Sequence, residues 1–269
     1  MGQVHAAQNP YLNTITTSGA MTMIKLPIKK IASCQEISKI IENSIRNKSS
    51  AGISLNILEA GCGQRWWFNL KDIPYHITGL DIDRDALEMR KNIQHDLDEI
   101  VEGDLRHVEL PKEKYDVIYC AYVLEHIKES DAVLKNFYTW LKQGGLLVLR
   151  VPDPRSVRGF ITNFTPHWFH VWAFKYIFGN SSAGKPGFGP FPTFYTDLLS
   201  RNGLSIFCEQ NGFTITAIYG ERAYYPRPVK PFIEAFIMIA ANLSLGFLNG
   251  GYDNTVFMLE KDPEKKRLS

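Results

Sequence analysis

A turn with two glycines, and three acidic residues spaced about 22 positions apart, lie in the first half of the chain. Residues of these types at this spacing suit the binding of a nucleoside. Gly61-Cys62-Gly63 follows an apolar run, and glycines at such a strand-to-helix turn let the backbone approach a ligand with N–H groups facing an anionic group. Asp81 lies 22 positions after Glu59, where a carboxylate can accept both hydroxyls of a ribose. A further 23 positions on, Gly103-Asp104-Leu105 offers a carboxylate for an exocyclic amine and a backbone N–H for a ring nitrogen.

The glycine turn does not match two common phosphate-binding motifs. A dinucleotide fingerprint needs a third glycine at position 66, where Trp66 stands. A Walker loop needs a Gly-Lys-Ser/Thr sequence, which does not follow the turn. The alternative is a plain Rossmann domain in which the acidic residues only cap helices.

Several side chains beyond the predicted nucleoside site could exchange a proton with a substrate. His126 is the leading base, because the ordinary pKa of histidine lies near neutrality, although Glu125 and His126 could instead brace a helix start. Tyr122 is a second proton acceptor or a group that positions the substrate. His167 and His170 are three residues apart and share one face if their segment is helical. Either could be a base on a lid, although such histidines more often cap or pack.

These side chains can meet in one site only if the strands that precede them end beside one another in a sheet. Asp83 can cap a helix after the second apolar run, and Gly144-Gly145 forms the turn that ends a helix through Val133, Phe137 and Leu141. Such β-α-β units predict a doubly wound α/β domain that binds its ligand outside the carboxyl ends of the strands. The predicted strands are Leu55–Ala60, His76–Ile82, a weaker run into Gly103-Asp104, Tyr115–Ala121 and Leu146–Val151.

Beyond Pro152 the alternation stops and later resumes. Of the chain's 33 aromatic residues (16 Phe, 12 Tyr and 5 Trp), 12 fall within Phe160–Tyr195. The pattern then predicts a helix near Thr196–Asn211, a strand near Phe213–Gly220, a helix near Lys230–Leu248 and a strand Thr255–Glu260. The whole chain therefore predicts a seven-stranded, mostly parallel sheet with an aromatic insertion after its fifth strand.

Five stretches of this pattern resemble the class I S-adenosylmethionine-dependent methyltransferases, in the group of ubiquinone-biosynthesis-like small-molecule O-methyltransferases. They are I-L-E-A-G-C-G at 57–63, G-L-D-I-D at 79–83, E-G-D-L at 102–105, Y-D-V-I-Y-C-A-Y-V-L-E-H-I at 115–127 and L-K-Q-G-G-L-L-V-L-R-V-P at 141–152. The resemblance implies a Rossmann-like methyltransferase fold, S-adenosylmethionine as the cofactor and methyl transfer to a small molecule. Oxygen is favoured as the acceptor atom, and nitrogen and carbon stay open.

The resemblance also implies cofactor-binding roles. Gly61 and Gly63 would bed the methionine part, Asp81 would hold the ribose, and Ile82 would pack on the adenine. Arg65 stands where the family usually has a third glycine, and it could instead reach the methionine carboxylate. Further cofactor contacts would come from Cys62 in the turn, Glu59 through the loop or a water, Asp104 and Leu105 at the adenine edge, and the backbone carbonyl of Cys120 at the adenine amino group.

Some members of that family bind a divalent metal through E-x-x-E-H to activate the substrate oxygen. Tyr122 occupies the first of these positions here, so one ligand is missing and we expect no metal. Glu125, His126 and a histidine of the lid could still form an incomplete site.

In this family the insertion after the fifth strand usually covers the acceptor. Packing in the core would explain most of its aromatic residues, and a substrate cavity or a partner could cover the remaining side. Residues 180–193, rich in Gly and Pro, predict a mobile gate. We therefore expect a hydrophobic or aromatic acceptor, such as a quinone, polyketide or lipid precursor. The aromatic spacing predicts a helix that is apolar almost all round, over Trp168, Phe169, Trp172, Phe174, Tyr176 and Phe178, the first three of which are candidate substrate contacts.

We expect a single domain with five parts. They are an N-terminal tail and cap helix (1–50), a cofactor-binding core (51–152), the substrate lid (153–195), the C-terminal part of the sheet (196–261) and a tail (262–269). Hydrophobic residues make up 45% and charged residues 22% of the 269 residues, which suits a globular protein. The net charge of +2 is too small for a nucleic-acid footprint, so we expect no nucleic-acid partner.

Cysteine usage and apolar runs suggest where the protein works. The four cysteines lack a C-x-x-C spacing, which suits a reducing cytoplasm, and Met1–Lys30 shows no secretory signal. Pro231–Leu248 is interrupted by Glu234, so we expect a buried or amphipathic helix and no membrane span, with peripheral membrane or lipid contact left open. Monomer and homodimer stay open, as does a cofactor-binding protein without methyl transfer.

Overall fold

The computed structural model describes residues 26–31, 33–49, 52–177, 179–185, 189–194, 196–225 and 227–262. The predicted tails therefore lie almost wholly outside the described residues. So do Phe178 and Tyr195 of the lid and residues 186–188 of the predicted gate.

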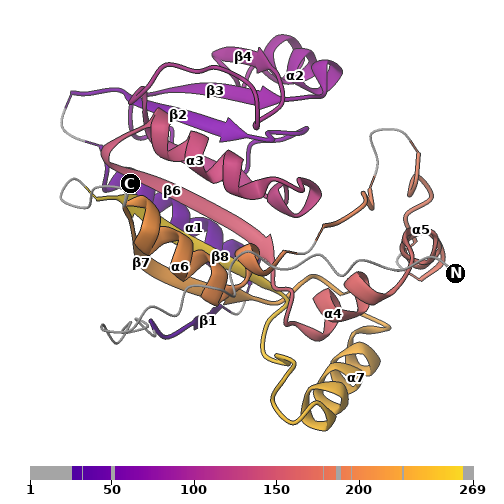
Figure 1. Ribbon diagram of the computed structural model, residues 1–269. Helices are drawn as coiled ribbons and strands as arrows, with labels where there is room; N and C mark the ends of the chain where they lie inside the picture. The colour runs from indigo at the N-terminus through magenta and orange to yellow at the C-terminus, as the bar shows by residue number, and fades with distance from the viewer. Residues whose placement is uncertain are drawn as a thin grey trace, which may run out of the picture.

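The described strands form one sheet in the order β1-β7-β8-β6-β5-β2-β3-β4 (Figure 1). All neighbours are parallel except β8, which is antiparallel to both β6 and β7. The predicted doubly wound α/β class is confirmed, with one strand more than the seven expected, because the three-residue β1 extends the edge beside β7. The strands are β1 (Lys29–Ile31), β2 (Leu55–Ala60), β3 (Tyr75–Asp81), β4 (Glu99–Glu102), β5 (Tyr115–Ala121), β6 (Leu141–Pro152), β7 (Phe213–Glu221) and β8 (Asn254–Lys261).

Helices cover both faces of this sheet, which explains why its central strands are almost continuously apolar. Side chains of α3 and α6 share one buried cluster with the sheet, and those of α1 and α2 share the other. The helices are α1 (Cys34–Arg46), α2 (Arg84–Met89), α3 (Ser130–Trp140), α4 (Val157–Phe164), α5 (His167–Tyr176), α6 (Arg201–Asn211) and α7 (Lys230–Leu243), with short helices η1 (Arg90–Gln94), η2 (Leu124–His126) and η3 (Asp197–Leu199).

A local signal sets the start of α2 where the sequence predicted it, whereas the end of α3 differs. Asp83 caps α2 by accepting from the backbone N–H of Ala86, as expected. The helix expected to include Leu141 ends instead at Trp140, and Leu141 begins β6. The pairing of β5 with β6 jumps from Leu141 to Leu146, and Gly144 has a φ of 70°, so the predicted glycine turn lies inside the strand.

Three further predicted elements differ from the structure. No helix follows β2, so the glycine turn leads into an irregular segment, residues 61–74, whose Trp66 and Phe68 pack against Tyr119. The helix expected from Thr196 begins at Arg201, because Ser200 caps it through the N–H of Gly203. The helix expected to reach Leu248 ends at Leu243, because two residues beyond it have positive φ, namely 52° at Leu245 and 88° at Gly246.

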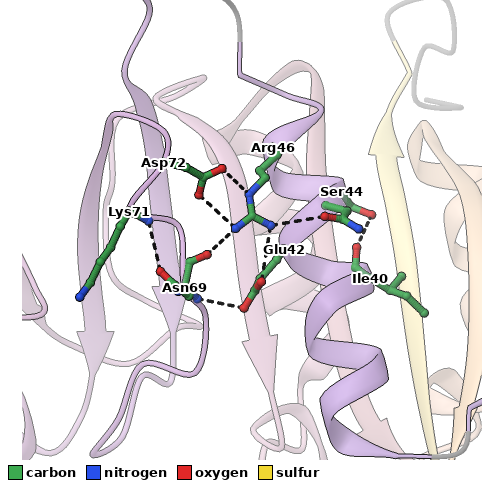
Figure 2. A network of polar contacts seen from close by, with 8 residues as sticks. Ile40, Glu42, Ser44, Arg46, Asn69, Lys71 and Asp72 are labelled. Carbon is green, nitrogen blue, oxygen red and sulfur yellow. Dashed lines mark hydrogen bonds and ion pairs between the residues drawn. The ribbon is translucent and has the colours of Figure 1, made fainter.

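Arg46 of α1 fixes the irregular segment that replaces the expected helix (Figure 2). Its Nε lies 2.7 Å from Oδ2 of Asp72, and its Nη2 lies 2.5 Å from the carbonyl oxygen of Asn69. Glu42, one turn earlier, accepts from the N–H of Asn69 at 2.9 Å. Helix α1 thus holds the loop beside the predicted cofactor site, and both pack in the same buried cluster.

Candidate functional site

A cavity of about 970 Å³ opens at the carboxyl ends of β2, β5 and β6. Strands β2 and β5 are neighbours, and the chain leaves them in opposite directions along the sheet, which is where doubly wound folds bind ligands. The helices α4, α5 and α7 lie together beyond the end of β6 (Figure 1), and each contributes side chains to the cavity wall.

The glycine turn forms the β2 edge of this cavity. Gly61 has a φ of 69°, its N–H donates to the Leu80 carbonyl at 2.7 Å, and a Cβ there would overlap the side chain of Val123. Gly63 has a φ of 53°, and a Cβ there would meet no atom within 4 Å. Gly61 is therefore required for packing, whereas Gly63 faces open space that a ligand can fill.

Asp81 ends β3 beside the glycine turn. Its Oδ2 accepts from the N–H of Gly63 at 2.9 Å, and its Oδ1 accepts from the N–H of Asp83 at 3.0 Å. Each carboxylate oxygen has two lone pairs, so both can still accept a hydroxyl. The next residue, Ile82, is 75% exposed and lies outside the strand, contrary to the expected strand end.

Asp104 follows β4, the strand next to β3 in the sheet. Arg106 binds the Asp104 carboxylate through two nitrogens, at 3.0 and 2.6 Å, and holds the pKa of Asp104 down at about 2. Leu105 and Cys120 are buried in the core. Gly63, Asp81, Ile82, Asp104, Leu105 and Cys120 are not among the cavity-lining residues, whereas Glu59, Gly61, Cys62 and Arg65 are.

A buried ion pair supports the glycine turn from below. Nη1 of Arg90 lies 2.7 Å from Oε2 of Glu59 and donates to the Cys62 carbonyl at 2.8 Å. Burial raises the pKa of Glu59 to about 8, and the positive charge of Arg90 only partly offsets this effect. Arg90 thus ties a cavity-lining carboxyl group to the backbone of the turn.

His126 faces the cavity from η2, after β5. Its Nδ1 lies 2.7 Å from the Pro192 carbonyl oxygen, and its ring packs edge-on against Phe191. Since a carbonyl only accepts, Nδ1 carries the proton and Nε2 keeps its lone pair. Burial lowers the pKa of His126, and the hydrogen bond to Pro192 partly offsets it.

Glu125 is a buried carboxyl group on the cavity wall whose Oε2 has no hydrogen-bond partner within the described part of the chain. Its Oε1 lies 3.9 Å from Nε2 of His126, and burial raises its pKa to about 8. The lid backbone is fixed here too, because the N–H of Phe194 donates to the Glu125 carbonyl at 2.6 Å.

Tyr122 lines the cavity and is held in place by a hydrogen bond. It has a φ of 59°, and its hydroxyl accepts from Nδ2 of Asn254 at 3.0 Å. Burial raises its pKa above the ordinary value, so the hydroxyl stays protonated at neutral pH and suits positioning better than proton abstraction. The Arg150 guanidinium lies 4.9 Å from the centre of its ring.

Sequence reasoning missed an ion-paired group on the floor of the cavity. Arg150 near the end of β6 binds Glu221 at the end of β7, with Nε to Oε2 at 2.9 Å, and Glu221 accepts from Sγ of Cys34 at 2.8 Å. All three residues line the cavity. The sequence did contain a signal for this pair, namely charged residues at the carboxyl ends of apolar strands. Such positions lie at the edge of the sheet where doubly wound folds bind their ligands.

Of the predicted substrate and histidine residues of the lid, some line the cavity and the others do not. Phe169 and His170 line the cavity, and Nε2 of His170 lies 2.7 Å from Oγ1 of Thr165. Trp168 is 68% exposed and Trp172 46% exposed; neither they nor His167 line the cavity. The expectation that core packing explains most of these aromatic residues is wrong for α5, which has no buried residue.

Arg65 remains placed to meet an anionic group. It lines the cavity with its guanidinium 4.3 Å from the centre of the Trp67 ring.

Within the ranges that the structure describes, no group of three or more His, Cys, Asp or Glu side chains could hold a metal ion. In the same ranges no helix has the length and apolarity to cross a membrane.

Comparison with known proteins places these observations in context. Residues 29–218 match the family described as "Methyltransferase domain". A Mycolicibacterium smegmatis protein named "Probable S-adenosylmethionine-dependent methyltransferase" is 27% identical over 99 residues, 36% of this chain and 38% of that protein. The ubiquinone biosynthesis O-methyltransferase of Haemophilus ducreyi is 26% identical over 116 residues, 40% of this chain and 49% of that protein. The match thus spans about half or less of these curated relatives.

A solved structure extends the likeness to nearly the whole described fold. The SAM-dependent methyltransferase structure from Methanosarcina mazei superposes with a TM-score of 0.51 and 16% sequence identity, over 82% of this chain and 98% of that chain. At this identity the likeness concerns the fold alone.

Proposed function

Because the chain belongs to the methyltransferase domain family, we propose that it transfers a methyl group from S-adenosylmethionine to a small apolar acceptor, with oxygen as the favoured acceptor atom. The observation that supports this most is His126, which lines a largely apolar cavity beside the glycine turn and keeps its Nε2 unprotonated. The name of the Haemophilus ducreyi relative agrees with oxygen as the recipient.

The residues at the strand ends fit the proposed cofactor. The open space at Gly63 and the acceptor capacity of Asp81 suit a ribose, and the exposed Ile82 suits an adenine ring. Asp104, Leu105 and the backbone of Cys120 would contact the adenine, and Arg65, Cys62 and Glu59 the methionine end. When bound, S-adenosylmethionine supplies an electrophilic methyl group on a sulfonium centre.

His126 would remove the proton from the acceptor hydroxyl. Pro192 accepts the hydrogen bond of Nδ1–H, and burial lowers the pKa of His126, so the ring is neutral at physiological pH. Tyr122, fixed by Asn254, would position the acceptor oxygen. The lid residues 189–194 contact Glu125 and His126 and would exclude water.

The cavity wall supports an apolar acceptor. Side chains from α4, α5 and α7 line it, among them Ile161, Phe169 and Ile233. The cationic groups at the floor are largely neutralised, since Arg150 is paired with Glu221 and Arg222 lies 3.7 Å from Asp253. An acceptor with several negative charges would therefore find few unpaired cations.

A matched panel of acceptors tests the proposal. The protein is incubated with S-adenosylmethionine and either an alkylphenol, the corresponding alkylaniline, the phenol's methyl ether or a sulfonated phenol, and products are analysed by mass spectrometry. We expect methylation of the alkylphenol and none of its ether, which has no free hydroxyl. Methylation of the aniline or of a ring carbon would identify a nitrogen or carbon methyltransferase. Turnover of only the charged phenol would contradict an apolar acceptor.

A further inference from the structure

Exposed apolar side chains are concentrated on the helices beyond the sheet. Of the twenty large apolar residues that are exposed in the described ranges, fifteen lie between residues 164 and 247. Helix α5 has no buried residue, and α7 has one, Ile237. We call the exposed apolar side chains at the end of α4, on α5, and on and just after α7 the apolar rim: Phe164, Trp168, Trp172, Tyr176, Phe232, Phe236, Met238, Ile239, Leu243, Leu245 and Phe247.

The rim residues belong to two groups of contacting side chains, one along α5 and one between α4 and α7. Along α5, the ring of Phe169 stacks on that of Trp172, which in turn contacts Tyr176. Helix α4 packs against α7, and Phe160 of α4 contacts Phe247 in the turn after α7. Figure 1 shows these three helices grouped together, apart from the helices that cover the sheet. A monomeric protein rarely leaves so large an apolar group in water, so the rim calls for an occupant.

The charges around the rim indicate which occupant it fits. Residues 154–196 contain four Lys or Arg residues and no Asp or Glu, and residues 222–252 contain three Lys or Arg residues and one Glu. These two segments have a net charge of +6, against +2 for the whole chain, so the rest of the chain is net negative. Arg155, Arg158, Lys175, Lys185 and Arg227 are all exposed. Exposed aromatic side chains flanked by basic ones match an anionic lipid surface.

The rim is also continuous with the cavity. Ile161, Phe169 and Ile233 face the cavity from the same helices whose neighbouring residues Phe164, Trp168 and Phe232 face outward. Helix α7 has 14 residues, about 21 Å in length, too short for the ~30 Å hydrocarbon core. These helices therefore suit a position in the membrane interface, parallel to its plane.

We propose that α5 and α7 dock this protein on an anionic phospholipid bilayer, with the apolar rim inserted among the headgroups and the basic residues facing the lipid phosphates. The cavity mouth then opens toward the lipid, which gives an apolar molecule a route that avoids water. The docking requires no methyl transfer, so it can be tested separately from the proposed reaction.

Flotation of the full chain with vesicles tests this docking. Vesicles of phosphatidylcholine alone are compared with vesicles containing phosphatidylglycerol, at low and high salt. We expect at least about tenfold stronger partition into the anionic vesicles, and its reduction by salt. The double variant F232E/L243E and the single variant W168E should each lose about tenfold. The control I53E/I93E places the same charges on exposed apolar residues elsewhere and should bind like the wild type.

Folding and self-association are measured alongside. Circular dichroism and thermal melting show whether each variant is folded, and sedimentation velocity gives the oligomeric state. Equal partition into neutral and anionic vesicles, no partition at all, or equal loss in the control variant would overturn the proposal. A wild-type dimer that F232E/L243E converts to monomer would also overturn it, because a second copy would then cover the rim.

Discussion

The Nδ1 atom of His126 lies 2.7 Å from the carbonyl oxygen of Pro192, across 66 residues of sequence. This hydrogen bond joins the end of β5 to the lid and fixes which imidazole nitrogen carries the proton. The lid thereby determines that Nε2 is the atom able to accept one.

Replacing His126 should slow methyl transfer and abolish the fall in its rate at low pH. Burial lowers the pKa of His126 below its ordinary value, so the neutral base should be lost only as the pH falls through that lowered pKa. The single-turnover rate of the wild type should therefore rise with pH through a value below about 6.5 and stay flat above it. H126Q should be about 10²- to 10⁴-fold slower. H167Q, outside the cavity, serves as the control; equal loss in both variants would argue against a base role.

Glu125 should make the protein less stable as the pH rises. Its pKa is about 8 in the fold and near 4.5 when unfolded, so between these values the folded state binds a proton that the unfolded state does not. The free energy of unfolding must then fall with rising pH over that range. E125Q, which stays neutral, should show a weaker decline in urea midpoint between about pH 5 and pH 8 than the wild type. Parallel curves for the two proteins would show that Glu125 is ionised in the fold.

The two glycines of the turn should respond differently to alanine. G61A places a methyl group against Val123, so it should unfold at lower urea concentration, and the second-site variant G61A/V123A should recover part of the loss. G63A meets open space and should lose only about 1 kcal/mol through its positive φ. Its cofactor affinity should nevertheless fall, as calorimetry would measure. Failure of V123A to rescue G61A would mean that the overlap is not the cause.

Variants of Asp81 and Asp83 should distinguish an effect on cofactor binding from an effect on stability. D81A removes the carboxylate that would hold the ribose, and we expect cofactor affinity to fall by about 1–3 kcal/mol, roughly 5- to 150-fold. D83A removes only the cap of α2, so it should lower stability by about 1 kcal/mol and leave cofactor affinity unchanged. Titration calorimetry of both variants decides this. Undiminished affinity in D81A would contradict the ribose role.

Much of the fold could be predicted because its signals are local. The apolar runs of β2 and β5 matched the structure residue for residue, since strands covered on both faces tolerate few polar residues. The predicted family is confirmed by the match over residues 29–218. The helix expected after Gly63 is absent because Trp66 and Phe68 pack against Tyr119, a tertiary contact that no local pattern contains.

The site was harder to predict for the same reason. The partners of His126 and Tyr122 are Pro192 and Asn254, far along the chain, so the roles of these side chains depend on contacts between distant segments. The Arg150–Glu221 pair joins two strands that are separated by the whole lid. For α5, aromatic composition predicted a helix correctly, but it could not indicate whether protein or another medium would cover it.

Transfer of a labelled methyl group tests the central claim most directly. The protein is incubated with S-adenosylmethionine carrying a CD₃ group and with the alkylphenol, and both products are quantified by mass spectrometry. The proposed function predicts CD₃ on the phenol oxygen and an equal amount of S-adenosylhomocysteine. Cofactor that binds but stays unconsumed with every acceptor tested would contradict it and identify a cofactor-binding protein without methyl transfer.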